Sequence, residues 1–179
     1  MGSGDRSITS LTLKSSQSVV ASALDLYSCS GPVRQLDPYS YHRLQAWACW
    51  LYGANSTFFW ALGDGGGGSS WNEYAARGHA YVPYFLDGTS VTPGKHMEAI
   101  REGIEDYEYF VMLRARVMKA EAGGRVGPAL ERARRLLAEG AHQVCHAKGA
   151  HDMSWSDAKD RSLADAVRVE ILEAMTALE

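Results

Sequence analysis

The side chains best suited to chemistry in this 179-residue chain follow a short apolar run and a glycine-rich loop. Trp71, Asn72, Glu73 and Tyr74 offer a stacking ring, an amide, a carboxylate and a phenol within four positions, and Asp64 stands at the start of the loop. Such groups, set in an otherwise apolar cleft, bind polyhydroxylated ligands through stacking and hydrogen bonds. We therefore take these five as candidate substrate-binding residues.

A purely structural interpretation of the same loop competes with this one. Trp71 would then pack into the core, and the charges of Asp64 and Glu73 would be solvated on a glycine-rich surface. The loop follows a strand-like segment, and loops on rigid scaffolds carry a large share of binding residues. That position favours the binding site over the structural interpretation.

Arg101 and Glu105 form a second candidate group, spaced four residues apart on a long helical segment. One interpretation is that Arg101 holds an acidic partner and thereby orients the binding loop. The alternative is a solvated stripe of ion pairs with Glu98 and Glu108, worth a few tenths of a kcal/mol per pair. Charge patterns of this kind are usually structural.

The chain also contains residue types that bind metals, but not in a recognised pattern. His142 and His146 are four residues apart with Cys145 between them, yet no second ligand pair has the spacing of a known metal site. A nucleophilic arrangement of a cysteine, a histidine and an aspartate is conceivable with Cys29, His42 and Asp25, although only the residue types suggest it. We predict no metal, no cofactor and no catalytic residue in this segment.

The elements that must position these residues are clear from periodicity. Residues 24–29 alternate in polarity, which predicts a strand. Residues 38–52 are predicted to form a helix, because they begin with Pro at the first helical position, have apolar residues at helical spacing and are followed by Gly53. Residues 57–62 are predicted to form a buried strand. A strand, a helix and a strand within about 40 residues predict a parallel βαβ unit. Its ligand site is expected where the carboxyl ends of the strands meet.

The rest of the chain is expected to be mostly helical. Residues 78–94 suggest an extended piece, and a long helix begins near Lys95 and ends at Gly123-Gly124. Its apolar face, expected to pack back against the sheet, consists of Met97, Ile100, Ile104, Tyr107, Val111 and Met118. Two further helices are expected, with these inward residues: Leu130, Ala133 and Leu137, then Leu163, Val167, Ile171, Ala174 and Leu178.

Three strings resemble one known family. They are Tyr41-His-Arg-Leu-Gln-Ala-Trp-Ala-Cys-Trp-Leu-Tyr-Gly-Ala54, Phe59-Trp-Ala-Leu62 and Ile100-Arg-Glu-Gly-Ile-Glu-Asp-Tyr-Glu-Tyr109. In this order they look like the C-terminal part of the catalytic domain of glycoside hydrolase family 123, formerly a domain-of-unknown-function family numbered 4091. The resemblance covers roughly residues 24–118, and the third string is its most specific part.

This resemblance implies a (β/α)8 TIM-type barrel that cleaves N-acetyl-β-galactosaminides. The acetamido group of the substrate acts as nucleophile in that family, assisted by an adjacent Asp-Glu pair, which departs from the usual two-carboxylate scheme. That pair lies on a middle strand, upstream of the part that this chain resembles. We therefore expect a C-terminal barrel fragment, with about two parallel strands, a crossover helix, a long helix and a small helical tail, that is inactive alone.

The domain organisation follows from the same elements. Residues 1–18 are rich in Ser, Thr and Gly and are expected to be a disordered leader or one introduced by cloning. Residues 19–179 are expected to form one α/β domain, with barrel-type units over 19–122 and C-terminal helices over 123–179. A stand-alone carbohydrate-binding or assembly module remains the alternative, because two strands alone expose unpaired edges.

Composition restricts the partners. The chain is 46% hydrophobic and 22% charged with a formal charge of −3, so it offers no basic field for nucleic acid and no apolar run for a membrane span. Its three cysteines suggest buried thiols rather than a disulfide framework. Carbohydrate is the expected ligand, and the expected protein partner is a second copy or the missing N-terminal half of the barrel. No signal peptide is apparent in the sequence. The sequence does not determine the cellular compartment, and a secreted or periplasmic parent protein is one alternative.

Overall fold

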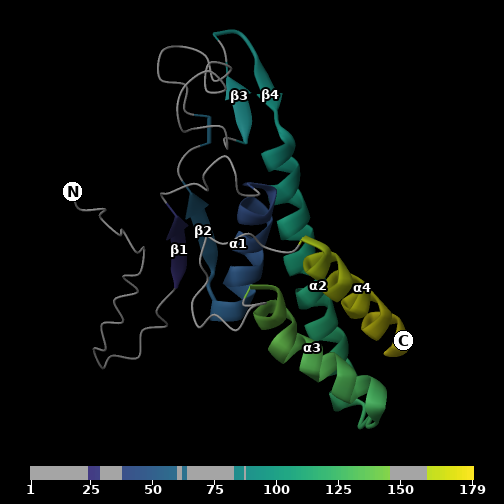
Figure 1. Ribbon diagram of the computed structural model, residues 1–179. Coiled ribbons are helices and arrows are strands. Elements are labelled where there is room, and N and C mark those ends of the chain that lie inside the picture. The colour runs from purple at the N-terminus through teal and green to yellow at the C-terminus, as the bar shows by residue number, and fades with distance from the viewer. Residues whose placement is uncertain (1–23, 29–37, 60–61, 64–82, 87, 146–160) are drawn as a thin grey trace, which may run out of the picture.

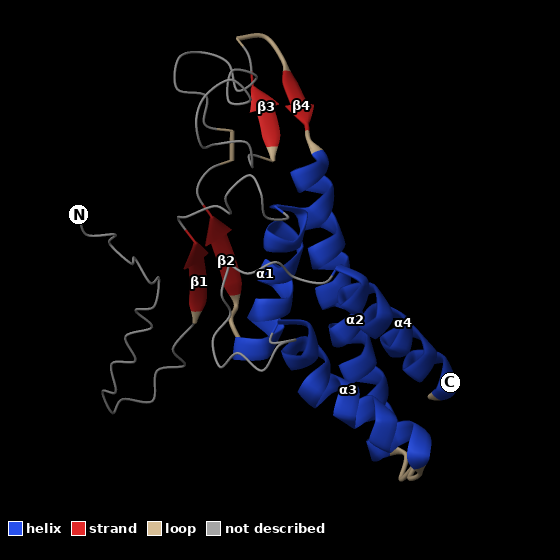
Figure 2. Ribbon diagram, viewed as in Figure 1, coloured by secondary structure: helices blue, strands red, loops and turns tan. Residues whose placement is uncertain are grey.

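The described part of the chain is mostly helical, with two small sheets (Figure 1). The structure is a computed structural model, and it describes residues 24–28, 38–59, 62–63, 83–86, 88–145 and 161–179. These residues form four helices, one two-stranded parallel sheet and one two-stranded antiparallel sheet. The helices lie together on one side of the parallel sheet, with α1 nearest to the strands (Figure 2).

The parallel sheet confirms the predicted βαβ unit. Strand β1 (Asp25–Ser28) pairs in parallel with β2 (Ser56–Phe59), and helix α1 (Pro38–Tyr52) connects them. Gly53 ends α1 with a φ of 63°, a left-handed conformation that glycine adopts without steric cost. Because α1 covers one face of the sheet, Thr57 and Phe59 point toward it and Phe58 is exposed on the other face.

The extended piece expected over residues 78–94 contains an antiparallel pair of short strands. Strand β3 (Tyr84–Leu86) pairs with β4 (Val91–Pro93), with Phe85 opposite Thr92. The chain then enters α2 (Lys95–Ala122), which ends at Gly123 as predicted. Gly94 lies close to Phe85, where a Cβ atom would be 2.9 Å from the ring, so the hairpin rests against the start of the helix.

The predicted inner face of α2 is wrong. None of the six apolar residues expected to pack on the sheet is fully buried, and two of them, Ile104 and Met118, are more than half exposed. The helix packs mainly on α1 instead of the sheet. It does so with a different face, made of His96, Ala99, Gly103, Asp106, Phe110, Leu113 and Val117.

Two features explain the choice of face. Gly103 lies so close to α1 that a Cβ atom would be 2.5 Å from the carbonyl oxygen of Arg43, so the two helices approach closely only along this side. Asp106 brings hydrogen-bond partners from other helices to the same side. Burial of Phe110 and Leu113 next to these residues supplies the apolar contact.

The last two helices complete the core. Helix α3 (Pro128–Cys145) buries Leu130 and Ala133 as predicted, with Leu136 more deeply buried than Leu137. Helix α4 (Arg161–Ala177) buries Val167, Ile171 and Ala174 as predicted, and Leu178 just beyond its end is also buried. One hydrophobic cluster contains residues from all four helices, including Trp47, Phe110 and Leu113.

The coarse fold class is confirmed, but no barrel is seen among the described residues. Their two sheets have two strands each and are not joined. No helix in this part of the chain is long and apolar enough to cross a membrane.

Candidate functional site

The structure brings four element ends together at one side of the molecule. Because β1 and β2 are parallel, Ser28 and Phe59 end the two strands side by side. Helix α1 begins near these strand ends, and the first turn of α2 reaches the same place through His96. In α/β folds this edge of the sheet is where ligands bind.

A cluster of rings occupies this edge. His42 of α1 lies between Phe59 and His96, with ring centroids 5.1 Å and 5.2 Å away. Tyr41 contacts His42 edge-on at 5.0 Å. Both histidines are buried, so they present imidazole nitrogens inside the protein next to the strand ends. The cluster therefore combines aromatic surface with groups that can donate or accept hydrogen bonds.

The nucleophilic set drawn from residue types does not form. Asp25 lies at the start of β1, where its carboxylate accepts a hydrogen bond from the hydroxyl of Ser56. His42 contacts Phe59 at the opposite end of the sheet, about 10 Å farther along the strands. Cys29 lies outside the described residues.

Below the ring cluster, a buried carboxylate joins three helices. Asp106 of α2 accepts hydrogen bonds from Arg43 Nε at 2.8 Å, from Trp47 Nε1 at 2.7 Å and from Arg168 Nε of α4. Arg43 also donates to Asp165 at 2.7 Å. Burial by itself would lower the pKa of Arg43, but the hydrogen bond and charge of Asp106, with a smaller effect of Asp165, raise it. Arg43 is thus a permanent cation in the core.

A second polar contact fixes α1 on the sheet. The hydroxyl of Thr57 in β2 donates to Oε1 of the buried Gln45 at 3.0 Å. Trp47 and Trp50, on the side of α1 that faces α2, pack against Phe110 with ring centroids 5.2 Å and 4.8 Å away. The helix that carries His42 is therefore held on both sides, which gives the ring cluster a rigid support.

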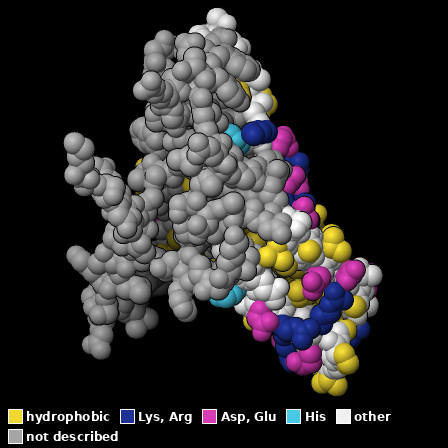
Figure 3. Space-filling view, in the orientation of Figure 1, with side chains coloured by type: hydrophobic (Ala, Val, Ile, Leu, Met, Phe, Trp, Pro, Cys, Tyr) yellow, Lys and Arg dark blue, Asp and Glu magenta, His cyan; other side chains and the backbone are white. Residues whose placement is uncertain are grey.

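The five residues predicted to bind substrate, Asp64, Trp71, Asn72, Glu73 and Tyr74, lie outside the described residues. Arg101 and Glu105, the predicted site-orienting pair, are described and lie on the outer surface of α2. Arg101 donates to Glu98 at 2.8 Å and to Glu105. The hydrogen bond to Glu98 and the charge of Glu105 raise the pKa of Arg101. These contacts are the ion-pair stripe of the structural interpretation, and acidic and basic side chains alternate along this edge (Figure 3).

The residues that suggested a metal site are not brought together in the described chain. His142 is exposed and Cys145 is buried in the core, while His146 and His151 lie outside the described residues. Among the residues that the structure does describe, no group of three or more His, Cys, Asp or Glu side chains could hold a metal ion.

Sequence reasoning missed the histidine pair and the buried carboxylate. Ala99, Gly103, Asp106 and Phe110 repeat at spacings of four, three and four residues, so a second helical face was present in the pattern. A glycine and an aspartate on this face lowered its apparent hydrophobicity. The pairing of His42 with His96 joins residues 54 positions apart, and no local pattern encodes it.

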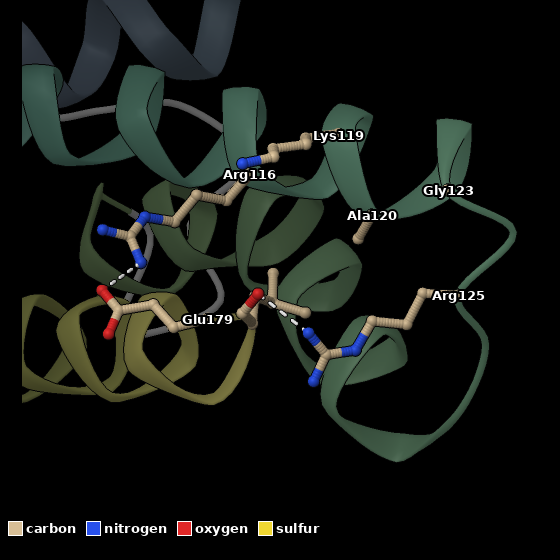
Figure 4. A pocket seen from close by; sticks show the side chains of 7 residues that line it. Arg116, Lys119, Ala120, Gly123, Arg125 and Glu179 are labelled. Atoms are coloured by element: carbon tan, nitrogen blue, oxygen red, sulfur yellow. Dashed lines mark hydrogen bonds and ion pairs between the residues drawn. The ribbon is translucent and has the colours of Figure 1, made fainter.

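A cavity of about 610 Å³ lies far from this site, between the C-terminal ends of α2 and α4 (Figure 4). Its two arginines already have partners: Arg116 donates to the carbonyl of Met175 and to Glu179, and Arg125 donates to the carbonyls of Ala177 and Leu178. These guanidinium groups cap the end of α4, which stabilises the helix terminus. The cavity is about 40 Å from the start of α2, the length of that helix.

Comparison with known proteins adds no relative to these observations: no protein-family model, curated protein or solved structure matches this chain.

Proposed function

We propose that this chain is the C-terminal part of a glycoside hydrolase that acts on N-acetyl-hexosaminides of the β-N-acetylgalactosamine type. In this proposal it supplies a wall of the sugar site, and β1, α1 and β2 belong to a TIM-type barrel. The observation that carries the proposal is the meeting of both strand ends and both helix starts at one edge, beside buried histidine and aromatic rings. The resemblance of the strings around His42 and Asp106 supplies the substrate class.

The reaction in this proposal is substrate-assisted, so the acetamido oxygen of the sugar attacks the anomeric carbon and an Asp-Glu pair assists. No aspartate is followed directly by glutamate anywhere in the 179 residues. The chain therefore contributes binding and not the acid or the assisting group. Trp71 and Tyr74 are proposed to stack on sugar rings, and Asp64, Asn72 and Glu73 to hydrogen-bond hydroxyl groups.

Turnover of an aryl N-acetyl-β-galactosaminide tests the assignment. We expect no turnover by the 179 residues alone, and turnover by the same chain extended with its upstream coding sequence. Normal activity of the 179 residues alone would contradict the absence of the catalytic pair. An extended protein that hydrolyses other glycosides but not this substrate would contradict the substrate class.

The Trp71→Ala variant tests whether this chain supplies a wall of the sugar site. We expect it to weaken binding of N-acetylgalactosamine by about tenfold in calorimetric titration, because loss of a stacking ring removes roughly 1.5 kcal/mol. Trp71→Phe, which keeps an aromatic ring, should retain most of the affinity. Unchanged affinity of the Trp71→Ala variant would contradict sugar binding by Trp71 and favour a structural role for this residue.

A second function, a non-catalytic carbohydrate-binding or assembly module, rests on the free surfaces of the parallel sheet. Within the described residues β1 and β2 pair only with each other, so each strand has one open edge. Tyr27 and Phe58 are neighbours in the register and are both exposed on the face away from α1. Exposed edges and aromatic faces of this kind are usually covered by a partner. If the upstream-extended protein lacks hydrolase activity yet binds the sugar, this second function is favoured.

A further inference from the structure

The surface of α2 carries an apolar stripe that the described residues cover only in part. The stripe consists of Met97, Ile100, Ile104, Tyr107, Val111 and Met118. Ile104 is 55% exposed and Met118 is 62% exposed, and the other four are partly exposed. The neighbouring face of the same helix, whose residues precede those of the stripe by one position, is filled by α1, α3 and α4. Within the described residues, Tyr107 packs edge-on against Trp50 of α1 with ring centroids 5.7 Å apart, so the stripe is covered on the side next to α1 and open around Ile104 and Met118.

The spacing of the stripe identifies the geometry of its partner. Met97, Ile104, Val111 and Met118 are seven residues apart, and Ile100 and Tyr107 each follow three residues after one of them. A repeat of this kind keeps one seam of a helix facing a second helix over several turns. A solvent-facing surface would instead place polar residues at the centre of the face.

The charges beside the stripe match a second copy of the same helix. Arg101 and Glu108 border the seam on one side, also seven residues apart. In an antiparallel pair with its two-fold axis level with the midpoint between Glu105 and Asp106, Ile104 faces Tyr107 of the other copy and Ile100 faces Val111. Arg101 then lies beside Glu108 of the other copy, and the symmetry repeats this pair. Opposite charges at such flanking positions select partner and orientation.

We propose that this protein forms a homodimer through antiparallel packing of the outer faces of two α2 helices. The seam uses Ile100, Ile104, Tyr107 and Val111, and the Arg101–Glu108 pairs fix its register. Arg101 keeps its contacts to Glu98 and Glu105 in one copy, because a guanidinium has five N–H donors and the ion pairs use two of them. Arg114 lies over the ring of Trp50, 5.1 Å from its centroid, and so leaves the end of the seam clear. The dimer does not depend on the proposed function.

Sedimentation equilibrium of the 179-residue chain over a concentration series tests this proposal. We expect the wild type to be dimeric and Ile104→Glu to be monomeric at the same concentration, because the new charge lies in the centre of the seam. Val126→Glu is the matched control: Val126 is also apolar and is 87% exposed, but it lies outside the stripe, so the dimer should persist. A monomeric wild type, or a dimer that survives Ile104→Glu, overturns the proposal.

Charge reversal tests the register. Arg101→Glu and Glu108→Arg should each weaken the dimer at least about tenfold, since each places like charges side by side twice. The double variant restores opposite charges and should regain most of the affinity. Circular dichroism of each variant checks that α2 remains folded, because Arg101 also pairs within its own helix. A double variant as weak as the single ones overturns the assigned register.

Discussion

At the scale of single residues, Asp106 joins three helices. Asp106 is 2% exposed, and its carboxylate binds side chains from α1 and α4 while its backbone belongs to α2. Two of the three strings quoted in the sequence analysis meet here, since Arg43 and Trp47 come from the first and Asp106 from the third. The residues of that pattern therefore hold the helices together, beneath the edge where a ligand would bind.

Asp106→Asn should destabilise the fold by about 3–5 kcal/mol. The change keeps the volume of the side chain but removes the charge that balances the buried Arg43. Unfolding in urea, followed by circular dichroism, measures the effect. Asp165→Asn is the matched control, because Asp165 binds the same arginine from the surface, with 64% of its side chain exposed. The control should cost less than about 1 kcal/mol, and equal costs would contradict a burial-dependent role.

Cys49 should be a protected thiol. Burial, with a smaller effect from the charge of Asp25, raises the pKa of Cys49. At pH 8.5 we therefore expect slow alkylation by iodoacetamide in the native protein and fast alkylation in urea, with each cysteine quantified by mass spectrometry. Above about pH 9 the unfolded thiol loses its proton while the folded one keeps it, so Cys49 lowers folding stability as pH rises. Equal native and unfolded rates would contradict this environment.

At the scale of elements, the contact between α1 and α2 depends on Gly103. Gly103→Ala should destabilise the protein by about 1–3 kcal/mol, although alanine favours helices, because the new methyl group meets the backbone oxygen of Arg43. Gly140→Ala in α3 is the comparison variant. Its methyl group would meet the side chain of Val167 at 3.2 Å, which can adjust, so the cost should be smaller. Thermal unfolding of both variants gives the comparison.

The elements themselves were largely predictable. Proline at the start of α1 and glycine at the ends of α1 and α2 are local signals, and the structure confirms these bounds. The face of α2 was not predictable from periodicity, because that helix has two faces with helical spacing. The choice between them depends on the close approach at Gly103 and the hydrogen bonds of Asp106, which involve α1 and α4.

The candidate site was predictable only in its location. A parallel βαβ unit places the strand ends at one edge, and the sequence contained that signal. The ring cluster at that edge joins α1, β2 and α2, and such long-range contacts leave no spacing pattern in the chain. The assignment of the loop residues Asp64 and Trp71 to Tyr74 rests on residue type and stays a prediction.

At the scale of the whole molecule, α3 and α4 are expected to be required for folding. They cover Phe110, Leu113 and Val117 of α2, and α4 supplies Arg168 to the buried Asp106. A chain that stops after Ala122 would expose this apolar surface and leave the charges of the core unbalanced. We expect it to lose cooperative thermal unfolding and near-ultraviolet circular dichroism.

The control for this deletion is a chain that lacks residues 1–18 and keeps all four helices. That segment is predicted to be a leader, so its removal should shift the melting temperature by less than about 2 °C, whereas loss of α3 and α4 should abolish the transition. A cooperative transition in the chain that stops after Ala122 would show that residues 1–122 fold without the C-terminal helices. The two deletions thus compare the loss of the predicted leader with the loss of the helices that close the core.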